Sequence, residues 1–384
     1  MKKKVLICLL LLIVAITGAS SVRIVKADQL SDNVKEQLDN IDLSELEEYY
    51  NNLSNTDGQG YFDLISQMLS GNFNTEISSF PEYLGKIFLG KIQDYLPLLF
   101  SIIAIAILCG IINNVKGSFL SDGIADVIFF VCFSAIILLL STKIIVLWQD
   151  VQNVVNDISR LTQIMSPIIL TLMTASGGTV SATLYNPMVV FLSNGVTNIV
   201  LSIIVPLIGA MIIIGIVSNF STSVKIKKFS DFFSSLIKWI IGIIVTVFGI
   251  FLSIQGMSSA TYDGISIKVA KYAISNSIPL IGGFLKDGFD IMVAGSVIIK
   301  NTIGISVVIM LFYTIISPVV NIIALSLILK LCAAIVEPIS DVRISDFCTS
   351  MSKCTSYMIT AVLSVGFMLF LTVLLMIFSA NAFV

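Results

Sequence analysis

Six long apolar runs constrain this chain more than any other feature of its sequence. They lie at about 95–112, 124–147, 187–217, 239–256, 303–331 and 356–379. A helix of about 20 apolar residues crosses the hydrocarbon core of a bilayer. Hydrophobic residues make up 56% of the chain and charged residues only 12%, whereas a soluble domain is about one quarter charged. The pattern predicts an all-α, polytopic membrane protein.

Two of the runs are too long for one straight span. Residues 187–217 contain Pro206, and residues 303–331 contain Pro318. Proline lacks a backbone N–H and clashes with the preceding helical turn, so each run is either one bent helix or a tight pair of short helices. The expected number of spans is therefore about six to eight, not counting the N-terminal leader.

The residue types present in the chain argue against several kinds of catalytic and binding site. The chain has no histidine, and it lacks Walker A and Gly-x-Gly-x-x-Gly patterns. Without histidine, the commonest general base and metal ligand are missing, along with the Ser-His and Cys-His pairs. A net charge of −2 gives no basic field for nucleic acid. We therefore expect a non-enzymatic protein with no cofactor, metal or nucleic-acid partner. Cys348 and Cys354 could pair or bind a metal, but as isolated thiols they are more often small apolar fillers.

Polar side chains inside the apolar runs are few. Asn194 and Asn198 lie one helical turn apart, and Asn321 follows Pro318. At such depth, asparagines usually join helices by hydrogen bonds. The runs contain no acid or base with an evident counter-ion, whereas ion-coupled carriers normally have an intramembrane carboxylate. This weakens an interpretation as an active transporter.

The N-terminus has the pattern of a secretory signal. MKKKVLICLLLLIVAITG has a basic start and an apolar core, and Val25-Lys26-Ala27 resembles a cleavage site before Asp28. Residues 1–27 are therefore predicted to be a cleavable signal peptide, with an uncleaved first anchor as the alternative. In both cases the segment that follows starts outside the cytoplasm.

Residues 28–94 differ from the rest of the chain. They hold 13 of the 24 acidic residues, against three lysines. Apolar residues recur at helical spacing around 43–53 and 62–69, Ser44 with Glu47 predicts a capping box, and Asp57-Gly58-Gln59-Gly60 separates the two helices. We predict a small acidic helical extracytoplasmic region, which either packs on the membrane part or a partner or is a solvated spacer.

Two segments of the chain repeat each other. Residues 228–239 read KFSDFFSSLIKW and residues 343–354 read RISDFCTSMSKC, and the Ser-Asp-Phe triplets are 115 residues apart. Pro167 and Pro206 are 39 residues apart, as are Pro279 and Pro318. We predict two tandem repeats, 160–256 and 257–384, after two transmembrane helices within 95–159. All four prolines are expected to bend helices.

Each repeat opens with a half-apolar segment. The first reads SPIILTLMTASGGT (166–179), and the second reads IPLIGGFLKDGFDI (278–291). The second carries Lys286, Asp287 and Asp290, and each charge at the bilayer centre costs about 2.5–3.5 kcal/mol. These segments are therefore predicted to be re-entrant or interfacial half-helices.

Basic residues predict the orientation. Lys225, Lys227, Lys228 and Lys238 cluster around the first Ser-Asp-Phe segment, and Lys330, Arg343 and Lys353 surround the second. Both segments should be cytoplasmic, which makes the two repeats parallel and places the C-terminus outside. Four other lysines oppose this assignment, because they fall on the outer side: Lys268, Lys271, Lys286 and Lys300.

The Ser-Asp-Phe segments have two interpretations. In the structural one, Ser230 and Ser345 cap short amphipathic helices, with an aspartate in the first turn and a phenylalanine in the membrane interface. In the functional one, the two segments form a pseudo-symmetric cytoplasmic docking face for a partner such as a motor ATPase. The residues concerned are Lys228, Ser230, Asp231, Phe232, Lys238, Arg343, Ser345, Asp346, Phe347 and Lys353.

Several features of the chain together match those of a known family. They are the leader, the acidic outer region, the Pro-centred apolar stretches and the paired segments KKFSDFFSSLIK and RISDFCTSMSK. Over nearly its whole length the chain resembles the stage III sporulation protein AE family of endospore-forming bacteria. The resemblance implies a permease-like, multi-pass protein of the mother-cell membrane around the forespore, with its acidic region facing the intermembrane space.

The resemblance also implies partners but no catalytic residues. The family would contribute to a channel or secretion-like complex with the other stage III A proteins, one of them a cytoplasmic ATPase, and with the forespore stage II Q protein. The alternative is a stand-alone permease-like transporter of a small solute.

Overall fold

The computed structural model describes residues 38, 41–53, 60–69, 80–115, 122–220, 226–277 and 282–379, and these residues form an all-helical protein. The leader and Pro279 lie outside the described residues. The helices are α3 (Ser44–Asn51), α4 (Tyr61–Leu69), α5 (Phe80–Val115), α6 (Asp122–Ala175), α7 (Thr179–Val190), η1 (Phe191–Val196), α8 (Thr197–Ile199), η2 (Val200–Ile204), α9 (Val205–Phe220), α10 (Lys227–Ser277), α11 (Gly282–Val336) and α12 (Val342–Phe378).

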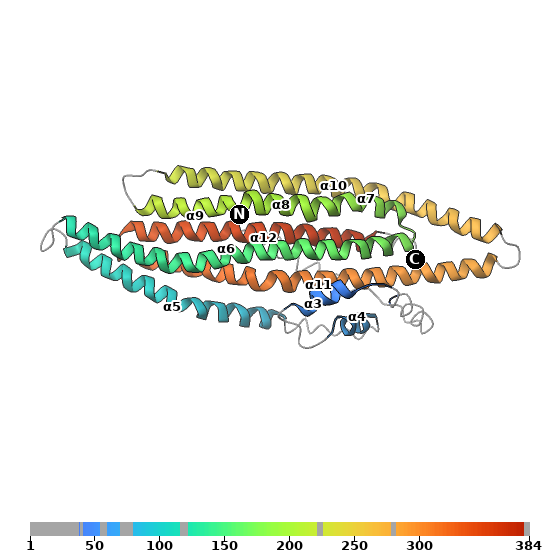
Figure 1. Cartoon of the computed structure of the whole chain (residues 1–384), viewed down its shortest axis with the longest axis horizontal. Coiled ribbons are helices and arrows are strands. Elements are labelled where there is room, and N and C mark those ends of the chain that lie inside the picture. Colours follow the sequence, from blue (N-terminus) through green and yellow to red (C-terminus); the bar gives the residue numbers. More distant parts are fainter. Residues whose placement is uncertain are drawn as a thin grey trace.

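The long helices lie side by side in an elongated bundle (Figure 1). At one end, which we call the hairpin end, α5, α9 and α11 finish and α6, α10 and α12 begin. At the opposite end, the far end, α6 and α10 finish and the C-terminus lies nearby. The long helices therefore alternate in direction along one common axis.

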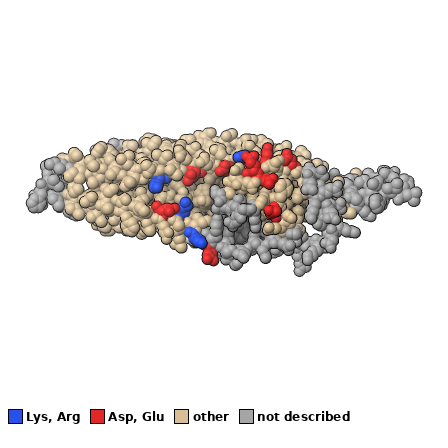
Figure 2. Space-filling model, turned by 60° about the horizontal axis from the view of Figure 1, so that its bottom comes forward, with Lys and Arg blue, Asp and Glu red and all other residues tan. Residues whose placement is uncertain are grey.

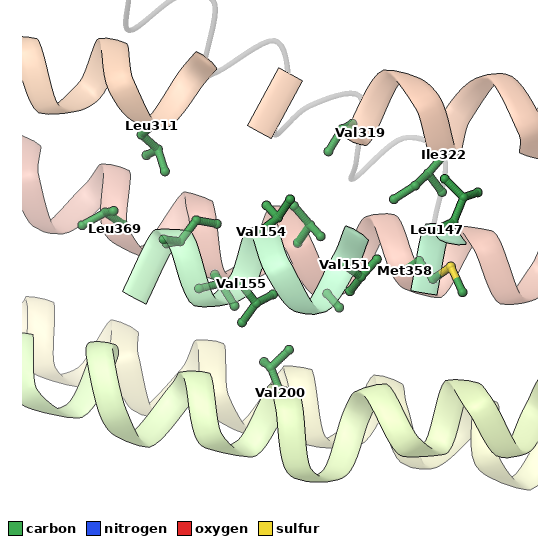
Figure 3. Packing of buried hydrophobic residues seen from close by; sticks show 14 of the residues in the cluster. Leu147, Val151, Val154, Val155, Val200, Leu311, Val319, Ile322, Met358 and Leu369 are labelled. Carbon is green, nitrogen blue, oxygen red and sulfur yellow. The ribbon is translucent and has the colours of Figure 1, made fainter. Parts of the chain in front are cut away.

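The core lies around α11 and α12, which contact each other most extensively. Buried side chains of α6, η2, α11 and α12 point toward one another, among them Val155, Val200, Leu311 and Leu369 (Figure 3). Gly366 allows a close approach in this core, because a Cβ there would overlap the side chain of Ile315. Small residues of this kind let helices pack tightly.

The half-apolar segments are not separate half-helices. α6 runs unbroken for 54 residues, through Pro167 to Ala175, and residues 282–291 form the start of the 55-residue α11. A turn with Gly177 at φ 87° then separates α6 from α7. This prediction is wrong for the described residues, because neighbouring helices can support a helix that continues through a proline or a polar stretch.

The two long apolar runs are each one helical stretch rather than a pair of helices. Residues 179–220 are helical throughout, with the π-helical segments η1 and η2 before Pro206. Pro318 lies inside α11. The bends assigned to Pro167, Pro206 and Pro318 stay predictions.

The acidic N-terminal region contributes α3 and α4, close to the predicted helices, and both pack on the bundle. The Tyr49 hydroxyl lies 2.9 Å from Thr314 Oγ1 of α11, and Tyr61 lies 2.9 Å from Ser306 Oγ. Arg160 of α6 donates to Glu48 at 3.0 Å. The predicted capping box is wrong, because Leu43 precedes α3 and Ser44 donates to Asp42. α3 and α4 therefore pack on the long helices of the chain, as the first alternative predicts, and do not form a solvated spacer.

Candidate functional site

Both Ser-Asp-Phe segments lie in the first turns of long helices at the hairpin end. α10 begins at Lys227 and α12 at Val342, so these starts have the same 115-residue offset as the two triplets. Both helices run from the hairpin end toward the far end (Figure 1). They also meet, since Lys238 Nζ of α10 lies 6.0 Å from the ring centroid of Tyr357 in α12. The two segments therefore begin helices of the same direction, and the tandem repeats with their boundaries stay a prediction.

The start of α12 is capped by Asp341, not by Ser345. The Asp341 carboxylate accepts from the Arg343 backbone N–H at 2.9 Å and from the Arg343 side-chain Nε and Nη2 at 3.1 and 2.9 Å. The Arg343 guanidinium also lies 3.5 Å from the ring centroid of Phe129 in α6. Ser345 Oγ donates to the Ala333 carbonyl of α11 at 3.0 Å. The predicted cap is wrong here, because Ser345 lies inside the helix and joins α12 to α11.

The start of α10 is more open. Ser230 lies within the first turn rather than before it, so it does not occupy the N-cap position. Lys228, Phe229, Asp231 and Phe232 are exposed, and the Asp231 carbonyl accepts from Ser235 Oγ. We call these four exposed residues the α10 edge.

The two copies differ most at their phenylalanines. Phe232 is 55% exposed and Phe347 is 1% exposed. The Phe347 ring lies 5.4 Å from that of Phe133, which lies 5.9 Å from Phe220. α12 is central, whereas α10 lies along the edge of the bundle (Figure 1). The exposed members of the predicted docking set are therefore Lys228, Asp231, Phe232, Lys238 and Lys353, while Asp346 and Arg343 are half-buried.

The cysteines are arranged differently from the predicted possibility. Cys348 Sγ lies 3.9 Å from Cys332 Sγ of α11, and Cys354 is buried on α12. Within the part of the chain that the structure describes, no three His, Cys, Asp or Glu side chains form a metal-binding group. Cys332 and Cys348 thus lie buried against each other between α11 and α12.

Sequence reasoning missed two buried charged residues that secure helix ends. Asp263 of α10 accepts from the backbone N–H groups of Val180 and Ser181 at 3.0 and 3.3 Å, and also from Ser181 Oγ. Lys300 of α11 donates to the carbonyls of Ile377, at 3.0 Å, and Ser379. A carboxylate suits a helix N-terminus and a cation a helix C-terminus. The sequence offers the lone charges as a signal, but not the helix end that each one meets.

The asparagines of the apolar runs have different roles. Asn321 Oδ1 accepts from the Tyr95 hydroxyl at 2.9 Å, which joins α11 to α5 as predicted. Asn194 and Asn198 are instead exposed on the outer face of η1 and α8. The prediction is wrong for these two, because their side chains point away from the helices of this chain.

The architecture defines a class of protein first. Among the described residues, six helices are long and apolar enough to cross a membrane, which is the pattern of a multi-pass membrane protein. The stage III sporulation protein AE family profile matches residues 61–380, so the chain belongs to that family and the resemblance is confirmed.

A curated relative agrees with this assignment. The chain is 28% identical over 284 residues to stage III sporulation protein AE of Bacillus subtilis (strain 168), covering 74% of this chain and 71% of that protein. No solved structure matches the chain.

Proposed function

We propose that this protein is a non-enzymatic integral membrane component of the channel complex that joins the mother cell to the forespore. The observation that carries the proposal is the family match over residues 61–380. The six long apolar helices support an integral rather than a peripheral role. The protein would lie in the mother-cell membrane around the forespore.

The proposal assigns partner-binding surfaces to two separate parts of the molecule. The α10 edge presents Lys228, Asp231 and Phe232 at the hairpin end and would meet the cytoplasmic ATPase. The acidic helix α3, with exposed Glu45 and Glu48, lies on the bundle away from that end and would face the other stage III A proteins and the stage II Q protein. The predicted leader supports this orientation, because it places the acidic region outside the cytoplasm.

Affinity purification from sporulating cells in mild detergent tests the ATPase contact. The variant Asp231→Arg/Phe232→Ala changes only exposed side chains, so the protein should accumulate normally. We expect recovery of the ATPase to fall about tenfold or more, the equivalent of about 1.4 kcal/mol of binding. The matched control is Phe378→Ala, an exposed phenylalanine at the end of α12 away from the α10 edge.

Two outcomes would count against these ideas separately. Equal ATPase recovery with both variants would remove the α10 edge as the docking face but leave the channel role. Recovery of the wild-type protein without any membrane or ATPase partner would contradict the channel role itself.

One observation favours the alternative, a stand-alone permease-like transporter. The exposed residues Asn186, Asn194, Asn198 and Ser202 follow one another at four- or eight-residue steps along α7, η1, α8 and η2. π-helical turns occur frequently at functional sites. Solute flux by the purified protein in liposomes, without partners and lost in Asn194→Leu/Asn198→Leu, would support this alternative.

A further inference from the structure

The outward face of α6 changes character within one unbroken helix. Between residues 127 and 146 the exposed side chains are mainly large and apolar: Val127, Phe130, Val131, Leu138, Leu139, Ile145 and Val146. Thr142 and Lys143 are the polar exceptions. Between residues 149 and 174 the same helix exposes polar side chains and Pro167: Gln149, Asn153, Asn156, Asp157, Arg160, Gln163, Thr171 and Thr174. The first face suits lipid and the second suits water.

The neighbouring antiparallel stretch changes at the same level. Trp148 Nε1 donates to the Val205 carbonyl at 3.1 Å, and Ser159 Oγ donates to the Ser193 carbonyl at 2.7 Å. These contacts set residues 203–217, which expose Ile203, Ile213 and Val217, beside the apolar part of α6. Residues 183–202 lie beside its polar part and expose Thr183, Asn186, Pro187, Val190, Asn194, Asn198 and Ser202.

α5 shows the same transition, with Leu89, 60% exposed, as an apolar exception on its polar side. The exposed side chains of α5 include Asp94, which pairs with Lys91, and then Phe100, Ile107, Leu108 and Ile111 toward the hairpin end. Tyr95 joins Asn321 of α11 near the change. α11 does not mark the change in this way, because its exposed apolar residues lie on both sides of Asn321: Leu327 and Leu331 toward the hairpin end, and Ile291 and Met292 toward the far end.

Residues typical of a membrane interface gather near this level. Of the chain's two tryptophans, Trp148 lies at the change on α6, whereas Trp239 of α10, 73% exposed, lies within the apolar part of its helix. Tryptophan is enriched where membrane meets water. On α6, the exposed Lys143 lies five residues before Trp148, where it can extend to lipid headgroups.

Charge is distributed in the same way. Figure 2 shows a broad uncharged surface toward the hairpin end, while acidic and basic side chains lie in the middle and toward the far end. The acidic helix α3 packs on α6 at Asp157 and Arg160, beyond the change. Its exposed carboxylates require water, because charged groups in lipid are costly.

We propose that the lipid bilayer surrounds only the hairpin-end half of the molecule, with its boundary near Pro97, Trp148 and Ile203. The remainder, which we call the projecting half, stands in water and includes α3, α4 and residues 149–175 of α6. At about 1.5 Å per residue, that part of α6 reaches about 40 Å beyond the boundary. The inference does not depend on the channel role.

The proposal accounts for two of the four lysines that oppose the orientation. Lys286 and Lys300 lie in the first part of α11, 35 and 21 residues from Asn321, which pairs with Tyr95 near the boundary. The positive-inside bias applies within about 15–20 residues of a span end, so these two lysines no longer count against a cytoplasmic hairpin end. Lys268 and Lys271 lie only 15 and 18 residues beyond Ser253, the end of the apolar stretch of α10, and still oppose it.

On α10 the apolar exposed surface extends further from the hairpin end than it does on α6, since Ile243, Val245 and Ile250 are exposed beyond Trp239. α10 and α5 lie on opposite sides of the bundle, and α10 begins further from the tip of the hairpin end than α5 and α6 do (Figure 1). A bilayer inclined to the bundle axis would reach further along α10 than along α6. Transmembrane helices are tilted by about 20° on average.

Cysteine accessibility in nanodiscs tests the boundary. The full-length chain, with its native cysteines replaced, carries one cysteine at a time and is reconstituted without partners in phosphatidylethanolamine and phosphatidylglycerol. The matched pairs are Leu138→Cys with Thr171→Cys on α6, and Ile213→Cys with Asn186→Cys on α9 and α7. All four side chains are exposed in the folded protein, so only lipid should distinguish them.

We expect a charged maleimide to label Thr171→Cys and Asn186→Cys at least about tenfold faster than Leu138→Cys and Ile213→Cys, because the reaction requires a hydrated thiolate. After unfolding in detergent, all four variants should be labelled at the same rate. Protection of Thr171→Cys and Asn186→Cys to the level of Leu138→Cys would overturn the proposal. Asn153→Cys and Thr174→Cys replace Thr171→Cys or Asn186→Cys if either of these does not elute as a folded species.

Discussion

Phe232 and Phe347 occupy equivalent places in the two Ser-Asp-Phe segments, yet only Phe347 is buried. We expect Phe347→Ala to lower the free energy of unfolding by about 3–5 kcal/mol, because it leaves a cavity beside Phe133. Phe232→Ala should change it by no more than about 0.5 kcal/mol. Unfolding in detergent micelles, followed by circular dichroism, measures both. Equal losses would mean that the two segments share one environment.

Asp263 is the second residue whose environment makes a sharp prediction. Asp263→Ala removes the acceptor for two backbone N–H groups at the start of α7, where the N-cap residue Gly178 offers no side chain. Unsatisfied buried donors cost about 1–3 kcal/mol, so the midpoint of thermal unfolding should fall. The control is Asp231→Ala, because Asp231 is exposed on the same helix. Unchanged melting of the Asp263 variant would show that water replaces the carboxylate.

At these residues, the sequence predicted the role of Asn321 but not the cap of α12. Helix caps depend on where a helix begins, and a shift of a few residues moves Ser345 from a cap position into the helix. Asp341, four residues earlier, follows the ordinary preference for aspartate at the N-cap. The contact of Arg343 with Phe129 joins residues from distant parts of the chain, so no local pattern could reveal it.

Among the elements, α3 offers a pH-dependent contact. Burial raises the pKa of Tyr49 to about 12 and raises the pKa of Tyr61 as well, whereas tyrosine in an unfolded chain ionises near pH 10. The contact of α3 and α4 with the bundle should therefore be fully stable below about pH 10 and weaken as the pH rises from 10 to 12. The difference in tyrosinate absorbance between wild type and Tyr49→Phe measures this. Titration of Tyr49 near pH 10 would contradict its burial.

The helices themselves were predicted by type but not by length. Residues 149–163 of α6 are mostly polar, so hydropathy ends a span before them, yet the helix continues to Ala175. Likewise, residues 303–331 and 356–379 are apolar because protein surrounds much of α11 and α12. A helix that is apolar all round is buried either in lipid or in a protein core, and periodicity alone does not separate the two.

For the whole molecule, helix length predicts a visible asymmetry. α11 has 55 residues, so it measures about 80 Å, whereas a bilayer including its headgroups is about 40 Å thick. Electron microscopy of the protein in nanodiscs should therefore show a body projecting about 40 Å from one face of the disc. Equal protrusion from both faces would place the bilayer at the middle of the bundle instead.

An unbroken helix also couples the two ends of the molecule mechanically. α6 extends from the hairpin end past its contact with Tyr49 at Asp157, with no loop or proline between. Bending such a helix sharply would require breaking its backbone hydrogen bonds, so a force applied at α3 is not absorbed along the way. A tilt imposed on one end must appear at the other as movement of the Arg343–Phe129 contact.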